Sequence, residues 1–467
     1  MTDVLTALGP HWDGRVAGTL EAARGVTVAR RCADLPELLS VAQAGLGRCV
    51  IVSHDLRGLD LSVVGRLRAG RLHVVGVHPP GDEGAERRLR QLGIAAVLPV
   101  DASPERFAEA VAGGSPAPAG PHAAQDLPLV GAFEVPDDVS GVADGGWSPA
   151  GSAAGRPDDE GTLAPREPDE HRPGRGRLVA VWGPTGAPGR TTVAVTVAAE
   201  LAARGMRVVL VDADTYGGCV GQTLGLLDEA PGLAAACRAA DHGGLDLPTL
   251  AGLAPEVTAG LRVLTGIPKA ERWTEIRAAS LERVLWLARG LADVVVADVG
   301  FCLENDEELS YDTLAPRRNE ATLTTLAAAD AVLAVASADP VGLQRLVRGL
   351  QEIGTVPSPP PFPVVNRVRS SAVGPHPETR ISESLLRFAG VEHVVYLPED
   401  REAVDAALLM GRSVVEHAPE CALRLAVARL VDAALPGVAS PSVIRSRWRR
   451  RAFLSGIAGG RFSPLRG

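Results

Sequence analysis

Aromatic residues and cysteines are scarce in this sequence of 467 residues. Aromatics make up only 3% of the chain, so its hydrophobic cores must be built mainly from Val, Leu, Ala and Ile. The six cysteines are scattered, without the CxxC or Cys/His spacing of a metal site, and a chain of this length needs no disulfide framework. We therefore expect reduced thiols, as in a cytosolic protein. The cysteines are Cys32, Cys49, Cys219, Cys237, Cys302 and Cys421.

Long uncharged apolar runs are also absent from the sequence. No stretch approaches the roughly 18 residues that a membrane-spanning helix needs, and the N-terminus lacks the basic-then-apolar profile of a secretory signal. We expect a cytoplasmic protein that touches a membrane only peripherally. The net charge of −9 argues against a nucleic-acid-binding surface that extends over the whole chain.

One segment rich in proline and glycine divides the chain. Residues 113–177 contain 10 Pro, 12 Gly and 11 acidic residues. Such a composition buries too little apolar surface to offset the entropy lost on ordering, so we predict a disordered linker. It separates a leader domain at 1–112 from a C-terminal domain at 178–438, which a basic tail at 439–467 follows.

Short β-branched runs alternate with helical stretches on both sides of the linker. In the leader domain, we expect strands at 4–8, 26–29, 49–53, 73–77 and 95–99, and helices that include 35–44 and 86–92. In the C-terminal domain, the expected strands are 178–182, 208–212, 294–298, 331–336 and 363–365. The helices between them include 192–204, 281–290, 341–353 and 401–410. This alternation predicts two doubly wound α/β domains with parallel sheets.

The most specific motif is LVAVWGPTGAPGRTT at residues 178–192, where a strand runs through a glycine-rich loop into a helix. Glycines let backbone N–H groups turn inward, and a helix N-terminus adds partial positive charge, so this context favours a phosphate-binding loop with Thr191 on Mg²⁺. The strict P-loop pattern is not met, because Pro184 stands at its first glycine and Arg190 at its lysine. A glycine-proline turn that only joins strand to helix is the alternative.

Two further strands end in aspartates. The second expected strand of the C-terminal domain ends in Asp212-Ala-Asp214, and the third ends in Asp298-Val-Gly300. The latter resembles a Walker B strand, whose Asp holds Mg²⁺ through water. Each acid alone could simply cap a strand end, but their order after the loop is that of a P-loop protein.

These residues carry a family resemblance that covers the C-terminal domain. It resembles the deviant Walker A ATPases MinD and ParA, and most of all the CpaE/TadZ proteins of pilus assembly, including actinobacterial members described as septum site-determining proteins. Residues 185–192 lie over the family's KGGxGKTT loop, Asp212 and Asp214 over its second-strand acids, and Asp298 over its switch II. The Asn-Arg pair at 366–367 lies over a segment near the adenine.

The resemblance implies an ATP–Mg²⁺ site and a nucleotide-linked homodimer. Its implied nucleotide contacts are Gly183, Thr185, Gly186, Ala187, Pro188, Gly189, Arg190, Thr191, Thr192, Asn366 and Arg367. Its implied Mg²⁺ residues are Thr191, Asp212 and Asp298, with Asp214 and Arg190 in catalytic roles. Thr185 stands where the family's signature lysine crosses to the partner, and Arg190 where its Walker lysine stands. Arginine keeps the charge but not the shape of an ammonium, so slow hydrolysis is expected.

The leader domain fails most requirements of a working receiver. Such a domain needs two acids after its first strand, an Asp after the third, Ser/Thr after the fourth and Lys after the fifth, because these groups hold Mg²⁺ and read the phosphate. Only Asp55, after the third strand, is present, and Leu8-Gly9-Pro10 follows the first. We expect a pseudo-receiver that binds a protein partner, with Asp55 an ordinary loop residue.

The C-terminal tail is strongly basic. Residues 441–467 contain seven arginines and no acids, with aromatic and aliphatic residues between them. A tail of this kind is a candidate for weak contact with anionic lipid or nucleic acid. On a helix, however, the arginines would not share one face, so the sequence favours a solvated tail.

The family resemblance implies a positional regulator. It would site a pilus, secretion or septum machine at a pole or septum, with its nucleotide state controlling dimerisation. Three alternatives stay open: a ParA-type DNA-partition ATPase, a P-loop ligase related to dethiobiotin synthetase, and a nucleotide-binding scaffold that does not hydrolyse. The first would need a basic DNA-binding face on the C-terminal domain.

Overall fold

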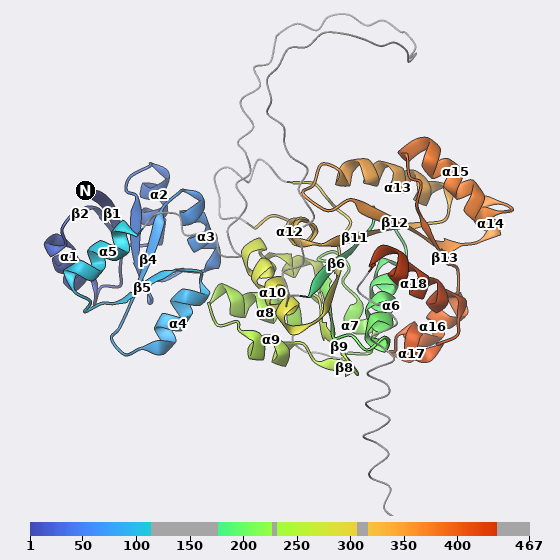
Figure 1. Ribbon diagram of the computed structural model, residues 1–467, viewed down its shortest axis with the longest axis horizontal. Coiled ribbons are helices and arrows are strands. Elements are labelled where there is room, and N and C mark those ends of the chain that lie inside the picture. Colours follow the sequence, from blue (N-terminus) through green and yellow to red (C-terminus); the bar gives the residue numbers. More distant parts are fainter. Residues whose placement is uncertain (114–175, 227–230, 306–315, 437–467) are drawn as a thin grey trace, which may run out of the picture.

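The computed structural model describes residues 1–113, 176–226, 231–305 and 316–436 (Figure 1). The predicted linker and basic tail lie outside these residues, apart from the two ends of the linker. Gly113 closes the last leader helix, and Arg177 already belongs to the first strand of the C-terminal domain. That domain therefore begins slightly before residue 178, the predicted boundary.

The leader domain is a five-stranded parallel sheet with helices on both faces (Figure 1). Its strand order is β2-β1-β3-β4-β5, and each neighbouring pair is parallel. This is the flavodoxin-like order of a doubly wound sheet, as the sequence predicted. The elements are β1 (Thr2–Ala7), α1 (Asp13–Ala22), β2 (Val26–Cys32), α2 (Leu35–Gln43), β3 (Cys49–Ser53), α3 (Leu61–Ala69), β4 (His73–His78), α4 (Glu83–Gln91), β5 (Ala96–Pro99) and α5 (Pro104–Ala112).

Short polar side chains determine where four of the leader helices begin. Asp34, Asp60, Asp82 and Ser103 each accept a backbone N–H from the first turn of α2, α3, α4 and α5, respectively. Helices cover both faces of the sheet, so β3 is buried along its whole length. The loop that carries Asp55 follows this central strand.

The C-terminal domain contains an eight-stranded sheet in the order β13-β12-β11-β6-β10-β7-β9-β8. Neighbouring strands are parallel except for β8 and β9. The strands are β6 (Arg177–Trp182), β7 (Val208–Ala213), β8 (Glu256–Thr258), β9 (Leu261–Leu264), β10 (Val294–Val299), β11 (Ala331–Ser337), β12 (Pro361–Val368) and β13 (Val395–Pro398). The helices are α6 (Arg190–Ala203), α7 (Val220–Thr223), α8 (Gly232–Asp241), α9 (Leu247–Leu253), η1 (Ala270–Glu275), α10 (Ala278–Leu291), α12 (Glu320–Ala328), α13 (Pro340–Ile353), α14 (Ser370–Val373), α15 (Pro377–Ala389), α16 (Arg401–Leu409), α17 (Val414–His417) and α18 (Ala422–Ala434).

Side chains along the central strands alternate between two cores. Leu178 and Ala180 of β6 pack with α8 and α10 on one face, whereas Val179 and Val181 pack with α6 and α18 on the other. Every residue of β7 and β10 is buried, as expected of strands covered on both faces. The predicted α/β class, and the five predicted strands of this domain, are confirmed. Three short strands, β8, β9 and β13, were missed.

Cysteine pairing and membrane-spanning helices can be judged over the described residues. All six cysteines lie there, and none forms a disulfide. Over the same ranges, no helix combines the length and apolarity needed to cross a bilayer.

Candidate functional site

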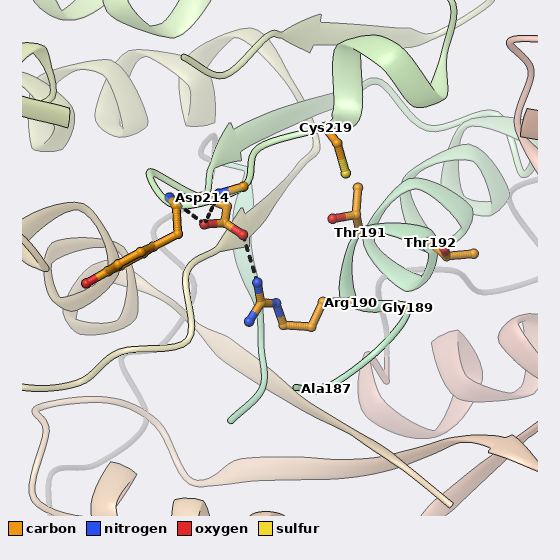
Figure 2. Close-up of a pocket in the computed structure, with 9 residues that line it drawn as sticks. Ala187, Gly189, Arg190, Thr191, Thr192, Asp214 and Cys219 are labelled. Atoms are coloured by element: carbon orange, nitrogen blue, oxygen red, sulfur yellow. Dashed lines mark hydrogen bonds and ion pairs between the residues drawn. The ribbon is translucent and has the colours of Figure 1, made fainter. Parts of the chain in front are cut away.

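The glycine-rich loop leaves the central strand β6 and opens directly onto helix α6 (Figure 2). Gly189 is the N-cap residue of α6, with a φ of 88°, a left-handed conformation that costs glycine little because it has no Cβ. Residues 190–192 form the first helical turn, where N–H groups have no partner within the helix and the helix dipole is positive. This is the strand–loop–helix arrangement of an anion-binding loop.

Close contacts require two of the loop's glycines. A side chain at Gly183 would collide with the carbonyl oxygen of Val335 on β11, and one at Gly189 would collide with the side-chain amide of Asn366. Asn366 donates from Nδ2 to the carbonyl oxygen of Pro188 at 3.1 Å. Strand β12 therefore supports the far side of the loop, and the predicted residue Asn366 reaches it.

The tip of the loop is exposed. Thr185 and Gly186 lie at the surface, and Arg345 of α13 donates from Nη1 to the carbonyl oxygen of Thr185 at 3.2 Å. Arg367 is exposed next to Asn366, with a positive φ of 58°. Thr185, Gly186 and Arg367 stay predicted nucleotide contacts.

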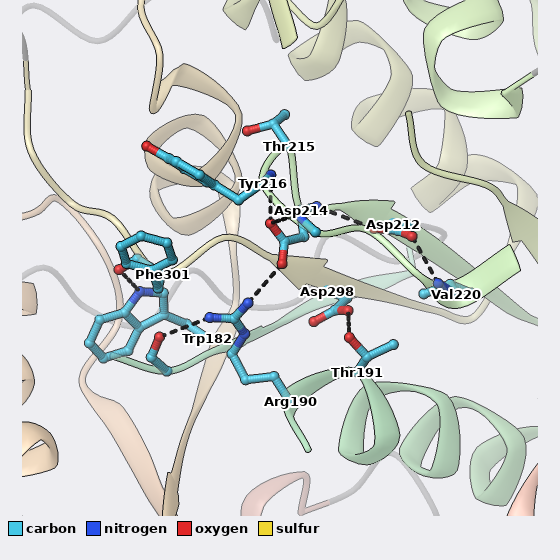
Figure 3. Close-up of polar contacts among 12 residues, drawn as sticks. Trp182, Arg190, Thr191, Asp212, Asp214, Thr215, Tyr216, Val220, Asp298 and Phe301 are labelled. Carbon is cyan, nitrogen blue, oxygen red and sulfur yellow. Dashed lines mark hydrogen bonds and ion pairs between the residues drawn. The ribbon is translucent and has the colours of Figure 1, made fainter. Parts of the chain in front are cut away.

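Arg190 is held by the protein, in the position where the motif has lysine (Figure 3). Its Nη2 donates to Asp214 Oδ2 at 2.7 Å, and its Nη1 donates to the carbonyl oxygen of Gly183 at 3.3 Å. The Arg190 and Asp214 side chains are only 13% and 5% exposed. Within the part of the chain that the structure describes, the buried Arg190 Nε has no hydrogen-bond partner. A phosphate that bound this guanidinium would have to compete with Asp214.

Thr191 and Asp298 meet at the start of α6 (Figure 3). Thr191 Oγ1 donates to Asp298 Oδ2 at 2.6 Å, while Asp298 Oδ1 is buried and has no hydrogen-bond partner among the described residues. Burial raises the pKa of the Asp298 carboxyl, although the Thr191 hydrogen bond and the charge of Arg190 oppose this shift. Hydroxyl and carboxylate oxygens are preferred ligands of Mg²⁺, so the unpartnered oxygen fits a cation at this point.

Asp212 lies beside this pair but is already engaged by the backbone. Its Oδ2 accepts the N–H of Val220 at 3.0 Å, and its Oδ1 accepts the N–H of Asp214 at 3.3 Å. Burial, followed by the negative charge of Asp298, raises the pKa of Asp212. A Cβ on Gly266 would lie 2.6 Å from the Asp212 carboxyl carbon, so backbone packs tightly around it. Asp212 thus anchors the turn after β7.

Asp214 organises that turn from its opposite end. Its Oδ1 accepts the N–H groups of Tyr216 at 2.9 Å and Gly217 at 3.2 Å, while Oδ2 accepts Arg190. The structure therefore brings the predicted catalytic residues Asp214 and Arg190 together, as an ion pair that faces the loop.

Arg190, Thr191 and Asp214 border a cavity of about 410 Å³ (Figure 2). Its volume lies within the range of small-molecule sites. Over the described ranges, no cluster of three or more His, Cys, Asp or Glu side chains is arranged to hold a metal, so a cation would depend on Thr191, Asp298 and oxygens of a ligand. The lining residues are Ala187, Gly189, Arg190, Thr191, Thr192, Asp214, Tyr216, Gly217 and Cys219.

Sequence reasoning missed an aromatic clamp at the edge of the site. The Tyr216 ring packs against Phe301, with centroids 4.8 Å apart, and the Arg318 guanidinium lies 3.7 Å from the Tyr216 centroid. Arg318 also donates to Thr215 Oγ1 at 2.9 Å, and Trp182 Nε1 donates to the carbonyl oxygen of Phe301 at 3.1 Å. The clamp joins the turn after β7 to the segment after β10. Its only sequence signal was the position of rare aromatics just after strand ends.

The corresponding edge of the leader sheet lacks such a constellation. A Cβ on Gly9 would collide with the Asp55 carboxylate, and the Gly9 N–H donates to Ser53 Oγ at 2.8 Å. The backbone after β1 therefore occupies the space beside Asp55 where the acids of a receiver would stand. The pseudo-receiver stays a prediction.

The comparison with protein-family models bears on the C-terminal domain. Residues 179–409 match the family described as "CobQ/CobB/MinD/ParA nucleotide binding domain". The match includes the glycine-rich loop and both aspartate-ended strands, β7 and β10. The C-terminal domain therefore resembles this family over 231 residues, just under half of the chain. No curated protein sequence matches the chain.

Solved structures are similar to the C-terminal domain at low sequence identity. A ParA family ATPase from Chlorobium tepidum is 19% identical, covers 55% of this chain and 97% of its own, and has a TM-score of 0.46. The septum site-determining protein MinD of Pyrococcus horikoshii, complexed with Mg-ADP, is 18% identical, covers 57% of this chain and 99% of its own, and has a TM-score of 0.43. A McdA variant from Cyanothece in complex with ATP is 16% identical, covers 56% of this chain and 96% of its own, and has a TM-score of 0.43.

Proposed function

We propose that this chain binds ATP–Mg²⁺ in the cavity at the start of α6 and uses its nucleotide state to control self-association. The observation that carries the proposal is the hydrogen bond between Thr191 and Asp298, which lies beside the glycine-rich loop at the N-terminus of α6. Phosphate oxygens would take the N–H groups of the loop and first helical turn. Thr191 Oγ1 and the unpartnered Asp298 oxygen would hold the cation, with Asp212 shaping the turn nearby.

Hydrolysis is expected to be slow. The ion pair between Arg190 and Asp214 occupies both groups that the family resemblance assigns to catalysis. Bound phosphate would draw Arg190 away from Asp214 and leave the carboxylate available to orient water. The planar guanidinium does not reproduce the compact charge of a lysine ammonium on the transferring phosphoryl group, so stabilisation of the transition state is weaker.

At the cellular level, we propose a positional role at a pole or septum, in which the protein sites a pilus, secretion or septum machine. The leader domain supports this role, because its receiver-like sheet lacks the acids of a phosphorylation site and is free to act as a docking module. Self-association would occur through the nucleotide face, where the exposed Thr185 lies.

Calorimetric titration of the full chain with ATP and ADP, each with and without Mg²⁺, tests the biochemical core of this proposal. Light scattering of each state reports the oligomer. We expect Mg²⁺-dependent binding and a larger species with ATP than with ADP. Absence of binding would contradict the proposed ATP binding. Binding without a change in size would contradict the proposed nucleotide-linked dimer.

Localisation tests the positional role against DNA partition. A labelled chain without residues 441–467 should keep a polar or septal focus, and further removal of residues 1–112 should disperse it. A partition ATPase would instead coat the nucleoid and bind duplex DNA with an affinity that falls steeply as salt rises. That result with the tail removed would favour the DNA-partition alternative.

A further inference from the structure

The leader domain and the C-terminal domain share a polar contact between two helix starts. Helices α3 and α4 of the leader face α8 and α10 (Figure 1). Arg277, the N-cap residue of α10, donates from Nη1 to Oδ2 of Asp60, the N-cap residue of α3, at 3.1 Å. The second contact comes from α4, where Arg88 donates from Nε to the carbonyl oxygen of His242 at 3.1 Å. Residues at the C-terminal end of α8 therefore meet the leader domain directly.

Tight packing accompanies these polar contacts. Gly243, just after α8, is buried with a φ of 67°, and a Cβ there would lie 2.7 Å from the Arg88 carbonyl oxygen and 3.1 Å from Leu92. Asp241 lies partly buried beside them, and one of its carboxylate oxygens has no hydrogen-bond partner in the described ranges. The interface is thus closely fitted on the α8 side and carries charge on both sides.

Helix α8 leads from this interface to the nucleotide site. At its opposite end, the N–H of Gly232 donates to Thr265 Oγ1 at 2.9 Å, and the N–H of Leu233 donates to the carbonyl oxygen of Thr265 at 3.0 Å. The next residue, Gly266, packs against the Asp212 carboxylate. A ten-residue helix is a rigid rod about 15 Å long. A shift of its C-terminal end would therefore be felt at the anchor of the turn after β7.

Helix α10 makes the second connection. It begins next to Arg277 and packs along α8, and the chain then enters β10, which carries Asp298. Both helices that touch the leader domain thus lead to an aspartate of the nucleotide site. Rigid elements of this kind can transmit coupling between distant sites.

On the leader side, the contact reaches the loop that holds Asp55. Arg88 also donates to the carbonyl oxygens of His54 and Leu59, which flank Asp55 in the loop between β3 and α3. One guanidinium therefore connects this loop with the end of α8.

We propose that the α3–α4 face of the leader domain is an internal docking surface whose partner is the α8–α10 face of the same chain, and that this contact couples the loop at 54–60 to nucleotide binding. The coupling rests on the proposed function. A partner that bound the loop at 54–60 would then alter the nucleotide site, and nucleotide would alter the loop to the same extent, because coupling between two binding sites is reciprocal.

Charge reversal at Arg277 tests this proposal in the full chain. Arg277→Glu places a negative charge beside Asp60 and Asp241 and should undock the leader domain, whereas Arg277→Lys keeps the charge and serves as the control. We expect faster hydrogen exchange in α3 and α4 of the Glu variant, and a Kd for Mg–ATP at least about fivefold away from the parent value, the low end of typical allosteric coupling. The Lys variant should stay within about twofold.

A second variant, Asp60→Ser, keeps a side-chain cap for α3 and removes only the charge of Asp60. It keeps the test valid if Arg277→Glu fails to fold. Released α3 and α4 with an unchanged Kd would overturn the coupling, and unchanged exchange in both variants would overturn the docking. If the parent chain itself binds no Mg–ATP, the proposed function fails and the coupling fails with it. If the parent binds Mg–ATP and a variant that releases α3 and α4 leaves the Kd unchanged, the coupling fails while the proposed function stands.

Discussion

The two sheets of this protein place loops at the same kind of edge, yet among the described residues only the edge of the C-terminal sheet brings several functional groups together. In the C-terminal domain, the carboxyl ends of β6 and β7 bring Arg190 and Asp214 to one cavity, and Asp298 after β10 is hydrogen bonded to Thr191, which lines it. In the leader domain, the corresponding ends of β1 and β3 bring together Gly9 and Asp55. A doubly wound fold therefore determines where a site can form, whereas individual side chains decide whether it does.

Burial sharpens this contrast. Asp298 is fully buried and its pKa is raised, while the side chain of Asp55 is 35% exposed. A buried carboxylate without a full set of partners is costly unless a cation or proton compensates it. The nucleotide edge is thus arranged to receive positive charge, and the leader edge is not.

The largest effect should come from adding a side chain at Gly189 in the glycine-rich loop. Gly189→Val adds a side chain where the Asn366 amide already lies and forces a branched residue into a left-handed conformation. We expect the affinity for Mg–ATP to fall at least about a hundredfold, or roughly 2.7 kcal/mol, in calorimetric titration. Gly252→Val, in open space on α9, is the matched control. Parent-like binding by the Gly189 variant would show that the loop does not hold phosphate.

The next effect concerns the rate of ATP hydrolysis. Lys269 is the only lysine in the sequence, and nearly all its basic residues, including Arg190 in the loop, are arginines. The double variant Thr185→Lys with Arg190→Lys restores both family lysines and should raise phosphate release about tenfold, equivalent to roughly 1.4 kcal/mol of barrier. Arg401→Lys, at the start of α16, controls for the replacement of arginine by lysine itself. Unchanged turnover would indicate that these positions do not limit hydrolysis.

A smaller effect concerns pH and the nucleotide-free chain. The folded state raises the pKa of Asp298 from its usual value near 4 to about 7, so folding favours the protonated carboxyl. The resulting stability is present at low pH and is lost as pH rises toward 7. The free energy of unfolding of Asp298→Asn, minus that of the parent, should grow by on the order of 1 kcal/mol between pH 5 and 7. A difference that stays constant across this range in urea titrations would contradict the raised pKa.

The smallest expected effect is at the leader edge. Small phosphodonors with Mg²⁺ should leave Asp55 unmodified, because backbone at Gly9 fills the space where additional acids would hold the cation. Intact-mass measurement after incubation with acetyl phosphate checks this, with Asp55→Asn to identify the position of any adduct. A stable phosphate on Asp55 would make the two edges chemically similar and overturn the pseudo-receiver.

The sequence alone was sufficient for the elements with strong local signals. The strands around the glycine-rich loop are long, β-branched and buried on both faces, so their hydrophobic runs are visible without a structure. The strands β9 and β13 have only four residues each, and β8 has three. Runs this short give only a weak periodic signal, although β5, also of four residues, was predicted. The pairing of β9 with β7 and of β13 with β12 depends on parts of the chain that are distant in sequence.

The sequence by itself determined the class of both domains, the phosphate-loop context and the candidates Thr191, Asp214 and Asp298, because each lies in or beside a locally recognisable strand or loop. Only the tertiary structure decided how these groups pair. It set Arg190 against Asp214, gave both oxygens of Asp212 to backbone N–H groups, and placed Arg277 opposite Asp60, 217 residues away. Such pairings depend on distances between segments remote in sequence, and packing of the whole sheet is what fixes those distances.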